Sequence, residues 1–269
     1  MKTEEGVKNR MFLNLKMAKV FEKYQPGDDG KLLKSLAPYF GYFVFDAAEI
    51  LQVGIEPIIK LASDAGVKIF LDGKYMGCPD TIARIAAIMQ KYGVDAFSLH
   101  AASYTKALEE AKKIQITPKE KSNSIEPQVF VETATGSPRL DYSDSESPLK
   151  ERLCRFAQVA KNAEADGLMV PAEYSSIFRD RANVLKNMVR LATGVTTSWS
   201  IPEAEEKRGG IRSPKNTDVR RCLDAGASAI MIGDDVLFPP ADIGTPAQAA
   251  AIIYKIVADF HEKCFLDKV

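Results

Sequence analysis

The sequence lacks the cysteine pattern of a disulfide framework or a zinc site. Only four cysteines occur in 269 residues, and they stand far apart at Cys78, Cys154, Cys222 and Cys264. No two of them have Cys-x-x-Cys or Cys/His ligand spacing. We therefore expect a reducing environment, a cytoplasmic protein and no metal site.

Long apolar runs and an excess of charge of one sign are also missing. The opening residues MKTEEGVKNR contain no apolar core of a signal peptide, and no stretch approaches the roughly 18 continuous apolar residues of a membrane span. Thirty-six Lys and Arg residues balance thirty-six Asp and Glu residues. We therefore expect neither a membrane nor nucleic acid among the partners.

What the chain does contain is an alternation of strand-like and helix-like segments, and 46% of its residues are hydrophobic. Short runs rich in β-branched and aromatic residues alternate with amphipathic helical patterns, such as residues 79–93 and 147–165. The eight candidate strands are RMFLNL (10–15), YFVFDA (42–47), VKIFLDG (67–73), DAFSLHA (95–101), QVFVETA (128–134), DGLMVPA (166–172), GVTTSWS (194–200) and SAIMIGD (228–234).

Eight βα units predict the fold class α/β and, within it, a single (β/α)8 TIM barrel that forms one domain over residues 1–269. A doubly wound open sheet more often uses five or six strands and is the less favoured alternative. The polar segment 136–148 follows the fifth predicted strand, on the face where barrels build their sites. It is either a lid over the site or a tolerated surface loop.

Two opposite charges mark the end of the third predicted strand, in the stretch FLDGKYMGCPDT (70–81). Side chains two residues apart on a strand point the same way, so Asp72 and Lys74 are expected to face the barrel mouth together. An isolated Asp/Lys pair is usually a solvated ion pair of little energetic value. Its position at the carboxyl end of a barrel strand favours a functional role.

The same stretch resembles the signature of the orotidine 5'-phosphate decarboxylases, in which a strand ends in Asp-x-Lys-x-x-Asp, followed by an apolar residue, Pro, any residue and Thr. Asp72, Lys74, Pro79 and Thr81 match this signature. Further segments resemble the second, fifth, sixth and eighth strand regions of the family: YFVFDAAEILQVG, VFVETATGS, ADGLMVPA and GASAIMIGDDVL. The resemblance covers most of residues 40–240.

The resemblance implies a homodimeric barrel that decarboxylates a phosphorylated pyrimidine nucleotide, a step of UMP synthesis, without a metal or organic cofactor. In this reading Lys74 donates a proton to the carbon from which the carboxylate leaves. Asp72 orients Lys74 and repels the departing carboxylate. Such a site works by electrostatic preorganisation with one positioned acid.

Candidate substrate-binding residues follow partly from the resemblance. They are Asn14, Thr81, Thr135, Arg212 and Gly233. Asn14 stands where the family has an aspartate that holds the ribose. Arg212 follows a glycine pair in EEKRGGIRSPK, which is either an anion-binding nest or a flexible basic loop.

Three positions depart from the family pattern. Alignment of the second strand region puts Val44 where the family has its first lysine, and Gly77 replaces the second aspartate of the signature. Asp234 follows Gly233 where the family has a phosphate-binding arginine. Slow decarboxylation is one interpretation of these changes. The alternatives are a diverged enzyme acting on another phosphorylated or anionic metabolite, and a non-catalytic paralogue that binds nucleotide or a protein partner.

Overall fold

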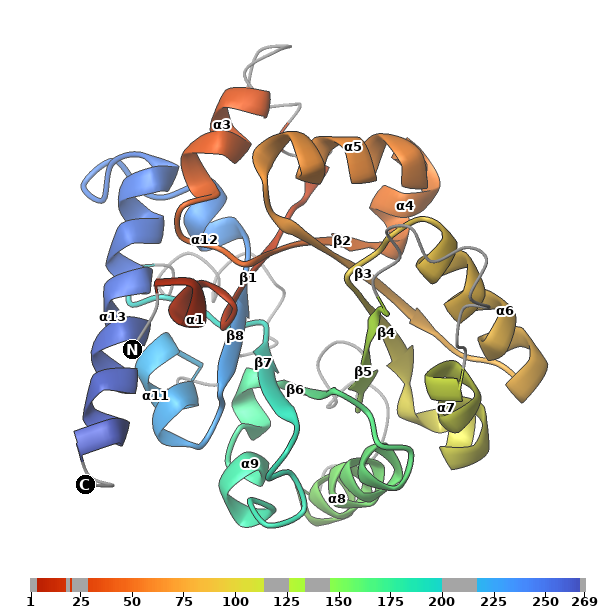
Figure 1. Cartoon of the computed structure of the whole chain (residues 1–269). Helices are drawn as coiled ribbons and strands as arrows, with labels where there is room; N and C mark the ends of the chain where they lie inside the picture. The colour runs from red at the N-terminus through yellow and green to blue at the C-terminus, as the bar shows by residue number, and fades with distance from the viewer. Residues whose placement is uncertain are drawn as a thin grey trace.

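Eight parallel strands close into one barrel, and each strand pairs with its neighbours in chain order (Figure 1). The computed structural model describes residues 4–17, 20, 29–113, 126–133, 146–199 and 217–266. The strands are β1 (Met11–Asn14), β2 (Tyr42–Asp46), β3 (Lys68–Tyr75), β4 (Ala96–His100), β5 (Gln128–Glu132), β6 (Gly167–Pro171), β7 (Val189–Thr193) and β8 (Ala229–Ile232). The predicted (β/α)8 barrel is confirmed.

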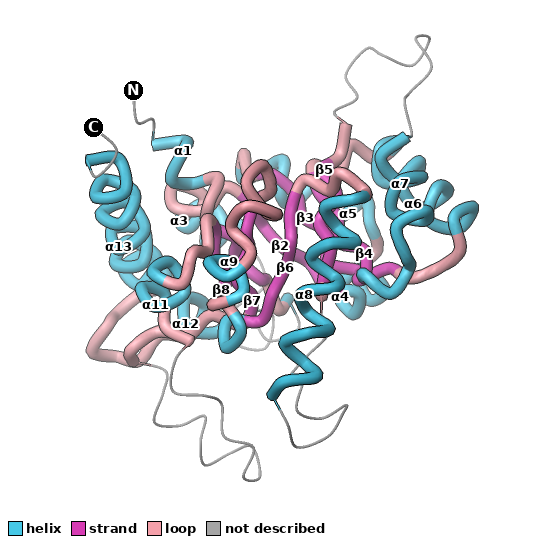
Figure 2. The backbone as a smooth tube through the Cα atoms, turned by 90° about the horizontal axis from the view of Figure 1, so that it is seen from below, coloured by secondary structure: helices cyan, strands magenta, loops and turns pink. Residues whose placement is uncertain are grey.

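Helices surround the strands on the outside, as the side view in Figure 2 shows. They are α1 (Glu4–Lys8), α3 (Asp29–Leu36), α4 (Ala47–Val53), α5 (Ile55–Ala65), α6 (Pro79–Lys91), α7 (Tyr104–Lys113), α8 (Glu146–Asn162), α9 (Ile177–Asp180), α11 (Val219–Asp224), α12 (Asp234–Leu237) and α13 (Pro246–Leu266). Two 3-10 turns, η1 (Ala101–Ser103) and η4 (Ala172–Tyr174), follow β4 and β6. Within the described part of the chain, no helix is both long enough and apolar enough to cross a membrane.

The interior of the barrel is filled by side chains from alternate strand positions. Phe70 packs edge-on against Phe12 and Phe130, with ring centroids 5.7 and 5.0 Å apart. The whole inner cluster comprises Phe12, Tyr42, Val44, Phe70, Ala96, Phe130, Met169, Leu191, Ala229 and Met231. The barrel is therefore a packed core, and a ligand can enter only at one of its ends.

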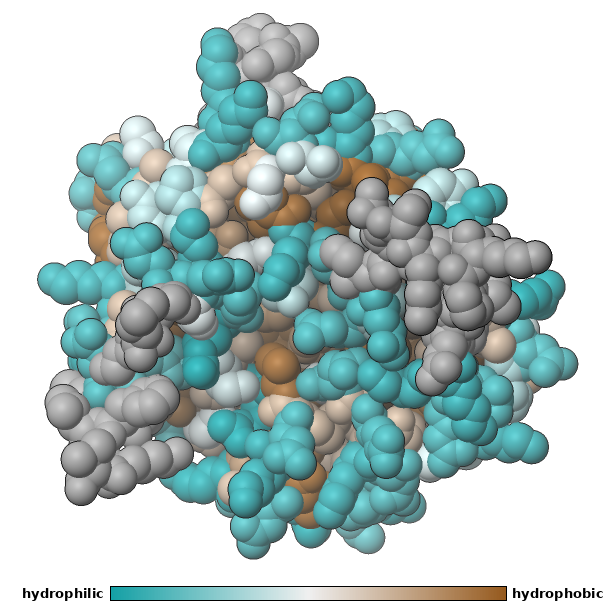
Figure 3. Space-filling view, in the orientation of Figure 1, coloured by the Kyte–Doolittle hydropathy of each residue, from teal (hydrophilic) through white to brown (hydrophobic). Residues whose placement is uncertain are grey.

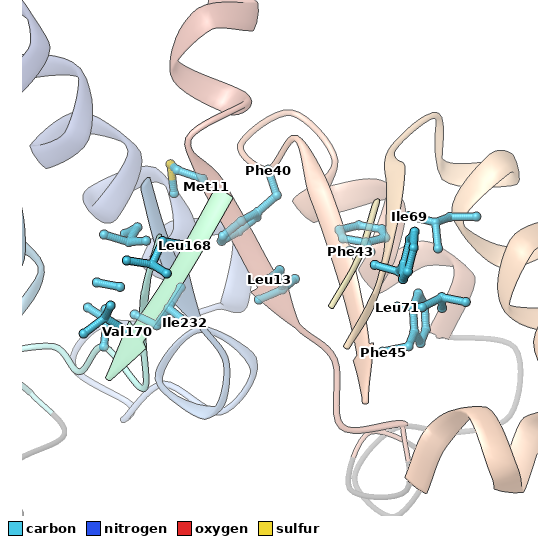
Figure 4. Packing of buried hydrophobic residues seen from close by; sticks show 14 of the residues in the cluster. Met11, Leu13, Phe40, Phe43, Phe45, Ile69, Leu71, Leu168, Val170 and Ile232 are labelled. Carbon is cyan, nitrogen blue, oxygen red and sulfur yellow. The ribbon is translucent and has the colours of Figure 1, made fainter. Parts of the chain in front are cut away.

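A second apolar layer lies between the strands and the helices (Figure 4). Phe43 and Phe45 on β2, with Ile69 and Leu71 on β3, point outward because side chains alternate along a strand. Burial on both faces explains why the strands read as continuous apolar runs. On the face shown in Figure 3, hydrophobic residues appear only in small separate patches among hydrophilic ones.

The seventh strand was predicted at the wrong place. Residues 194–200 were expected to form it, but β7 is Val189–Thr193. Gly194 has a φ of 65°, in the left-handed region that glycine adopts most readily, and it ends the strand. The segment that follows, up to Trp199, therefore lies in the loop after β7, at the barrel mouth.

Candidate active site at the barrel mouth

Asp72 and Lys74 meet at the carboxyl end of β3, as predicted. Asp72 is 3% exposed, and its Oδ2 pairs with Nζ of Lys74, whose side chain is 31% exposed. The ladder between β3 and β4 shifts register between Leu71 and Tyr75, and Lys74 has a φ of 48°. A non-glycine residue held in the left-handed region at such a position is typical of a functional site.

Ser98 on β4 supports both residues of this pair. Its hydroxyl donates to Oδ1 of Asp72 at 2.7 Å and accepts from the backbone N–H of Lys74 at 2.8 Å. Ser98 is completely buried. The unusual backbone of Lys74 is therefore fixed by a neighbouring strand, which sequence reasoning did not anticipate.

Glu132, the last residue of β5, is a second buried carboxyl beside Lys74. It is 4% exposed, and its Oε2 lies 3.4 Å from Nζ of Lys74. Burial, the largest effect, raises the pKa of Glu132, the Lys74 charge lowers it and the Asp72 charge raises it. Together these effects raise the pKa of Glu132 to about 8. Burial lowers the pKa of Lys74, but Asp72 and Glu132 more than offset it and hold that pKa above its ordinary value.

A further carboxylate, that of Asp46, lies at the end of β2, where the resemblance implies a lysine. Val44 pairs with Phe70 and belongs to the inner core, whereas Asp46 ends β2 and pairs with Asp72. The residue at the end of the second strand is therefore Asp46, two positions after the one that alignment suggested. Its carboxylate also caps α4, accepting from the N–H groups of Ala48 and Glu49 at 2.8 and 3.2 Å.

Asp46 is coupled to the buried carboxyl of Glu49. Burial raises the pKa of Asp46, but hydrogen bonds from Glu49 and from backbone N–H groups, together with the Lys74 charge, bring it below its ordinary value. Burial and the neighbouring Asp46 raise the pKa of Glu49 to about 7. Around Lys74, whose pKa is raised, the mouth thus combines Asp46, whose pKa is lowered, with two carboxyl groups, Glu49 and Glu132, whose pKa values are raised.

The raised pKa of Glu132 predicts a pH-dependent stability. Between about pH 4.5, its ordinary pKa, and pH 8, folded Glu132 keeps a proton that the unfolded chain has released. The free energy of unfolding therefore falls as the pH rises through this window. Glu132→Gln, which stays neutral, should match the parent at pH 5 and exceed its stability by about 1–3 kcal/mol at pH 8.5 in urea unfolding.

The matched control for this measurement is Glu56→Gln, on the exposed face of α5. It should change the stability by less than about 0.5 kcal/mol at either pH. A parent protein as stable at pH 8.5 as at pH 5, with no gain in Glu132→Gln, would contradict the buried protonated carboxyl. Glu49 contributes a slope of the same sign, so part of the pH dependence should remain in the variant.

The ends of β1 and β8 carry the other predicted residues that the structure describes. Gly233 lies directly after β8, and a Cβ atom there would come within 3.0 Å of the carbonyl oxygen of Asn14. The side-chain oxygen of Asn14 is buried without a hydrogen-bond partner among the described residues. Nζ of Lys16 lies 3.3 Å from Oδ2 of Asp234. The Asp234 carboxylate, at the position where the resemblance implies an arginine, is thus partly neutralised by a lysine that the sequence analysis overlooked.

Of the remaining predicted site residues, Thr81 contacts a residue of its own turn, and two others fall outside the described residues. Thr81 is in the first turn of α6, where its Oγ1 is 3.3 Å from Sγ of Cys78. Gly77 donates its N–H to Oγ of Ser103 at 3.3 Å, and a Cβ there would press on Thr81 at 3.0 Å. Thr135 and Arg212 fall outside the described residues, as does most of the segment 136–148.

The arrangement defines a class of site. The described residues contain no group of three or more His, Cys, Asp or Glu side chains placed to hold a metal ion. What they provide is a charged lysine held by buried carboxyl groups at the mouth of a closed (β/α)8 barrel. This combination suits proton transfer to or from a bound small molecule.

Comparison with known proteins identifies the family. The family model described as "Orotidine 5'-phosphate decarboxylase / HUMPS family" matches residues 31–230. The orotidine 5'-phosphate decarboxylase of Trichlorobacter lovleyi is 30% identical over 224 residues, which cover 82% of this chain and 86% of that protein. That of Geotalea daltonii is 25% identical over 228 residues, covering 83% and 88%. The chain belongs to the orotidine 5'-phosphate decarboxylase / HUMPS family.

Solved structures agree with this assignment at the level of the fold. The crystal structure of orotidine 5'-phosphate decarboxylase from Pyrococcus horikoshii superimposes with a TM-score of 0.65 at 21% identity. The match covers 92% of this chain and 99% of that one. The enzyme from Lactobacillus acidophilus gives a TM-score of 0.65 at 20% identity, covering 93% and 99%.

Proposed function

We propose that this protein is a carboxy-lyase that decarboxylates orotidine 5'-phosphate, with Lys74 and Asp72 as its catalytic residues. The observation that carries the proposal is the buried Asp72 carboxylate paired with Lys74 at the barrel mouth. Family membership supports the choice of reaction. Asn14, Thr81 and Gly233 are proposed to contact the substrate, and Thr135 and Arg212 are retained as candidates outside the described residues.

In the proposed reaction, the bond between the pyrimidine ring carbon and its carboxylate breaks and carbon dioxide leaves. The electron pair that remains on the ring carbon takes a proton from the Lys74 ammonium. Asp72 holds this ammonium in place, and its charge destabilises the substrate carboxylate more than the transition state, in which that charge is leaving. Raised pKa values keep Lys74 protonated and Glu132 largely neutral at pH 7.

The direct test is the loss of orotidine 5'-phosphate, followed by absorbance with the purified protein. We expect turnover below that of family members with a lysine at the end of the second strand, because Asp46 stands there. Turnover at their rate would contradict the role given to that position. A protein that binds uridine 5'-phosphate without any turnover would favour the non-catalytic alternative.

The homodimer is also a proposal, supported by exposed apolar side chains around the mouth. Leu51 on α4, Met76 after β3 and Tyr104 after β4 are 87%, 66% and 77% exposed. Gly77, which follows Met76, hydrogen-bonds Ser103, which precedes Tyr104, so these two apolar residues flank one contact. Large apolar side chains gathered on one face typically mark an interface.

Met76→Lys should therefore shift the protein from dimer to monomer, because a charge buried in an apolar interface is costly. Sedimentation at micromolar concentration would detect the change, with an expected weakening of at least about tenfold. Ile252→Lys is the matched control: Ile252 is 40% exposed on α13, across the barrel from α4 (Figure 1). A parent protein that sediments as a monomer would refute the proposed interface.

The proposed location is the cytoplasm, and the proposed unit is one domain over residues 1–269. Cys78, Cys154 and Cys222 are free thiols, and Cys78 is exposed. Free thiols are typical of a reducing compartment.

A further inference from the structure

A carboxylate of the chain occupies the hydrogen-bond donors at the start of the loop after β7. The backbone N–H of Thr197 donates to Oδ2 of Asp235 at 2.7 Å, and the Thr197 hydroxyl donates to the same oxygen at 2.9 Å. Thr197 is 3% exposed. Asp235 therefore replaces water, or any ligand, as the acceptor for both groups.

Other contacts hold Asp235 in this place. It is the second residue of the short helix α12, which follows β8. Nε1 of Trp199 donates to the Asp235 carbonyl oxygen at 3.3 Å, and the N–H of Val195 donates to the carbonyl oxygen of Met231 at 3.3 Å. The loop after β7 is thus tied to the end of β8 and to the start of α12.

These elements occupy a characteristic place in the fold. In (β/α)8 barrels, a phosphate-binding site is frequently formed by the loops after strands seven and eight and by the start of a short extra helix. Such sites use backbone N–H groups and hydroxyls as donors to phosphate oxygens. Here donors of that kind, in that place, already hold an anion that belongs to the chain.

The negative charge of Asp235 also disfavours a phosphate group at the Thr197 donors. A phosphate group at Thr197 would have to displace the Asp235 carboxylate or lie against it, and like charges in contact are unfavourable. The nearby cation Lys16 is engaged with Asp234 at 3.3 Å. Asp234 and Asp235 place two consecutive carboxylates directly after Gly233, at the end of β8.

We propose that Asp235 is a specificity-determining residue whose carboxylate fills the anion position at the ends of β7 and β8 and excludes the phosphate group of a ligand from it. The protein accordingly recognises its ligand mainly through the ring and sugar, and a 5'-phosphate contributes little to affinity. The choice of a pyrimidine ligand rests on the proposed function, whereas the exclusion of phosphate rests on the Asp235 contacts.

Isothermal titration calorimetry with uridine and uridine 5'-phosphate tests the proposal. The parent protein should bind the two within about threefold of each other. Asp235→Ala, which vacates both Thr197 donors, should bind uridine 5'-phosphate at least about tenfold more tightly, since two hydrogen bonds to a charged acceptor become available. Its affinity for uridine should stay within about twofold.

Two further variants distinguish the effect of occupied Thr197 donors from the effect of negative charge and from a loss of folding. Asp235→Asn keeps an oxygen that accepts from Thr197 but removes the charge, so it should retain the melting temperature and gain about threefold in phosphate-ester affinity. Asp234→Asn removes a charge from the adjacent residue and leaves the Thr197 donors occupied; a gain below about threefold is expected. If Asp235→Ala fails to fold, the Asp235→Asn result decides.

A second binding experiment, with inorganic phosphate as the ligand, does not depend on recognition of a pyrimidine. Phosphate binding, measured by phosphorus NMR line broadening, should be at least about tenfold tighter in Asp235→Ala than in the parent. That result without uridine binding in any variant would uphold the exclusion of phosphate and refute the proposed function. Parent protein that binds uridine 5'-phosphate tenfold more tightly than uridine, or variants with no gain for either phosphate probe, would overturn the proposal.

Discussion

Lys74→Ala is expected to lower kcat for orotidine 5'-phosphate by at least about 10³-fold, which is within the range for removal of a positioned general acid. No second ammonium lies among the described residues that contact Asp72 or Glu132, so no other ammonium there can take over the proton donation of Lys74. The absorbance assay at saturating substrate measures this loss. Because the Lys74 side chain is partly exposed, the variant should remain folded.

The matched control is Lys68→Ala, at the opposite end of the same strand. Lys68 is exposed, and its Nζ binds Oδ1 of Asn9 at 3.0 Å. Its removal should change kcat by less than about twofold. Substantial turnover in Lys74→Ala would mean that another group donates the proton. Unchanged ligand affinity in that variant, combined with an inactive parent, would show that the Asp72–Lys74 pair is a remnant of ancestry.

The barrel could be predicted from the sequence because each strand is buried on both faces and reads as a short apolar run. Seven of the eight predicted strands overlap the observed ones, and only β7 was displaced. The segment VRLATGVTTSWS is rich in β-branched residues on both sides of Gly194, so composition favours either half as the strand. Only the left-handed backbone of Gly194 in the folded chain decides between them.

The alternation of side chains along strands predicts part of the candidate site but not all of it. The same rule that grouped Asp72 with Lys74 would have found Glu132, because it stands two residues after the inward-facing Phe130. The rule also places Ser98 inside the barrel, two residues after the inward-facing Ala96, but its contact with the N–H of Lys74 depends on the register shift between β3 and β4. Asp235 could not be found in this way, because its role depends on a contact with Thr197, 38 residues away in the chain.

Removal of both carboxyl groups beside Lys74 is expected to destabilise the protein by more than the sum of the two single changes. In Asp72→Asn, the charge that helps to raise the pKa of Glu132 is gone, so Glu132 ionises at lower pH and pairs with Lys74. In Glu132→Gln, Asp72 keeps the pair. The double variant leaves the Lys74 ammonium without either partner, and we expect a coupling free energy of about 1–3 kcal/mol in urea unfolding at pH 7.

A third substitution shows whether the unpaired charge is the cause. Lys74→Met in the double variant should recover most of the lost stability, because an apolar side chain of similar length needs no partner in this place. For comparison, Lys60 and Asp64 form a pair at 2.9 Å whose side chains are 76% and 58% exposed, so Asp64→Asn should cost less than about 0.5 kcal/mol. Strictly additive single changes, or no recovery with methionine, would indicate that water stabilises the Lys74 ammonium. The buried carboxyl groups would then be needed for the reaction and not for folding.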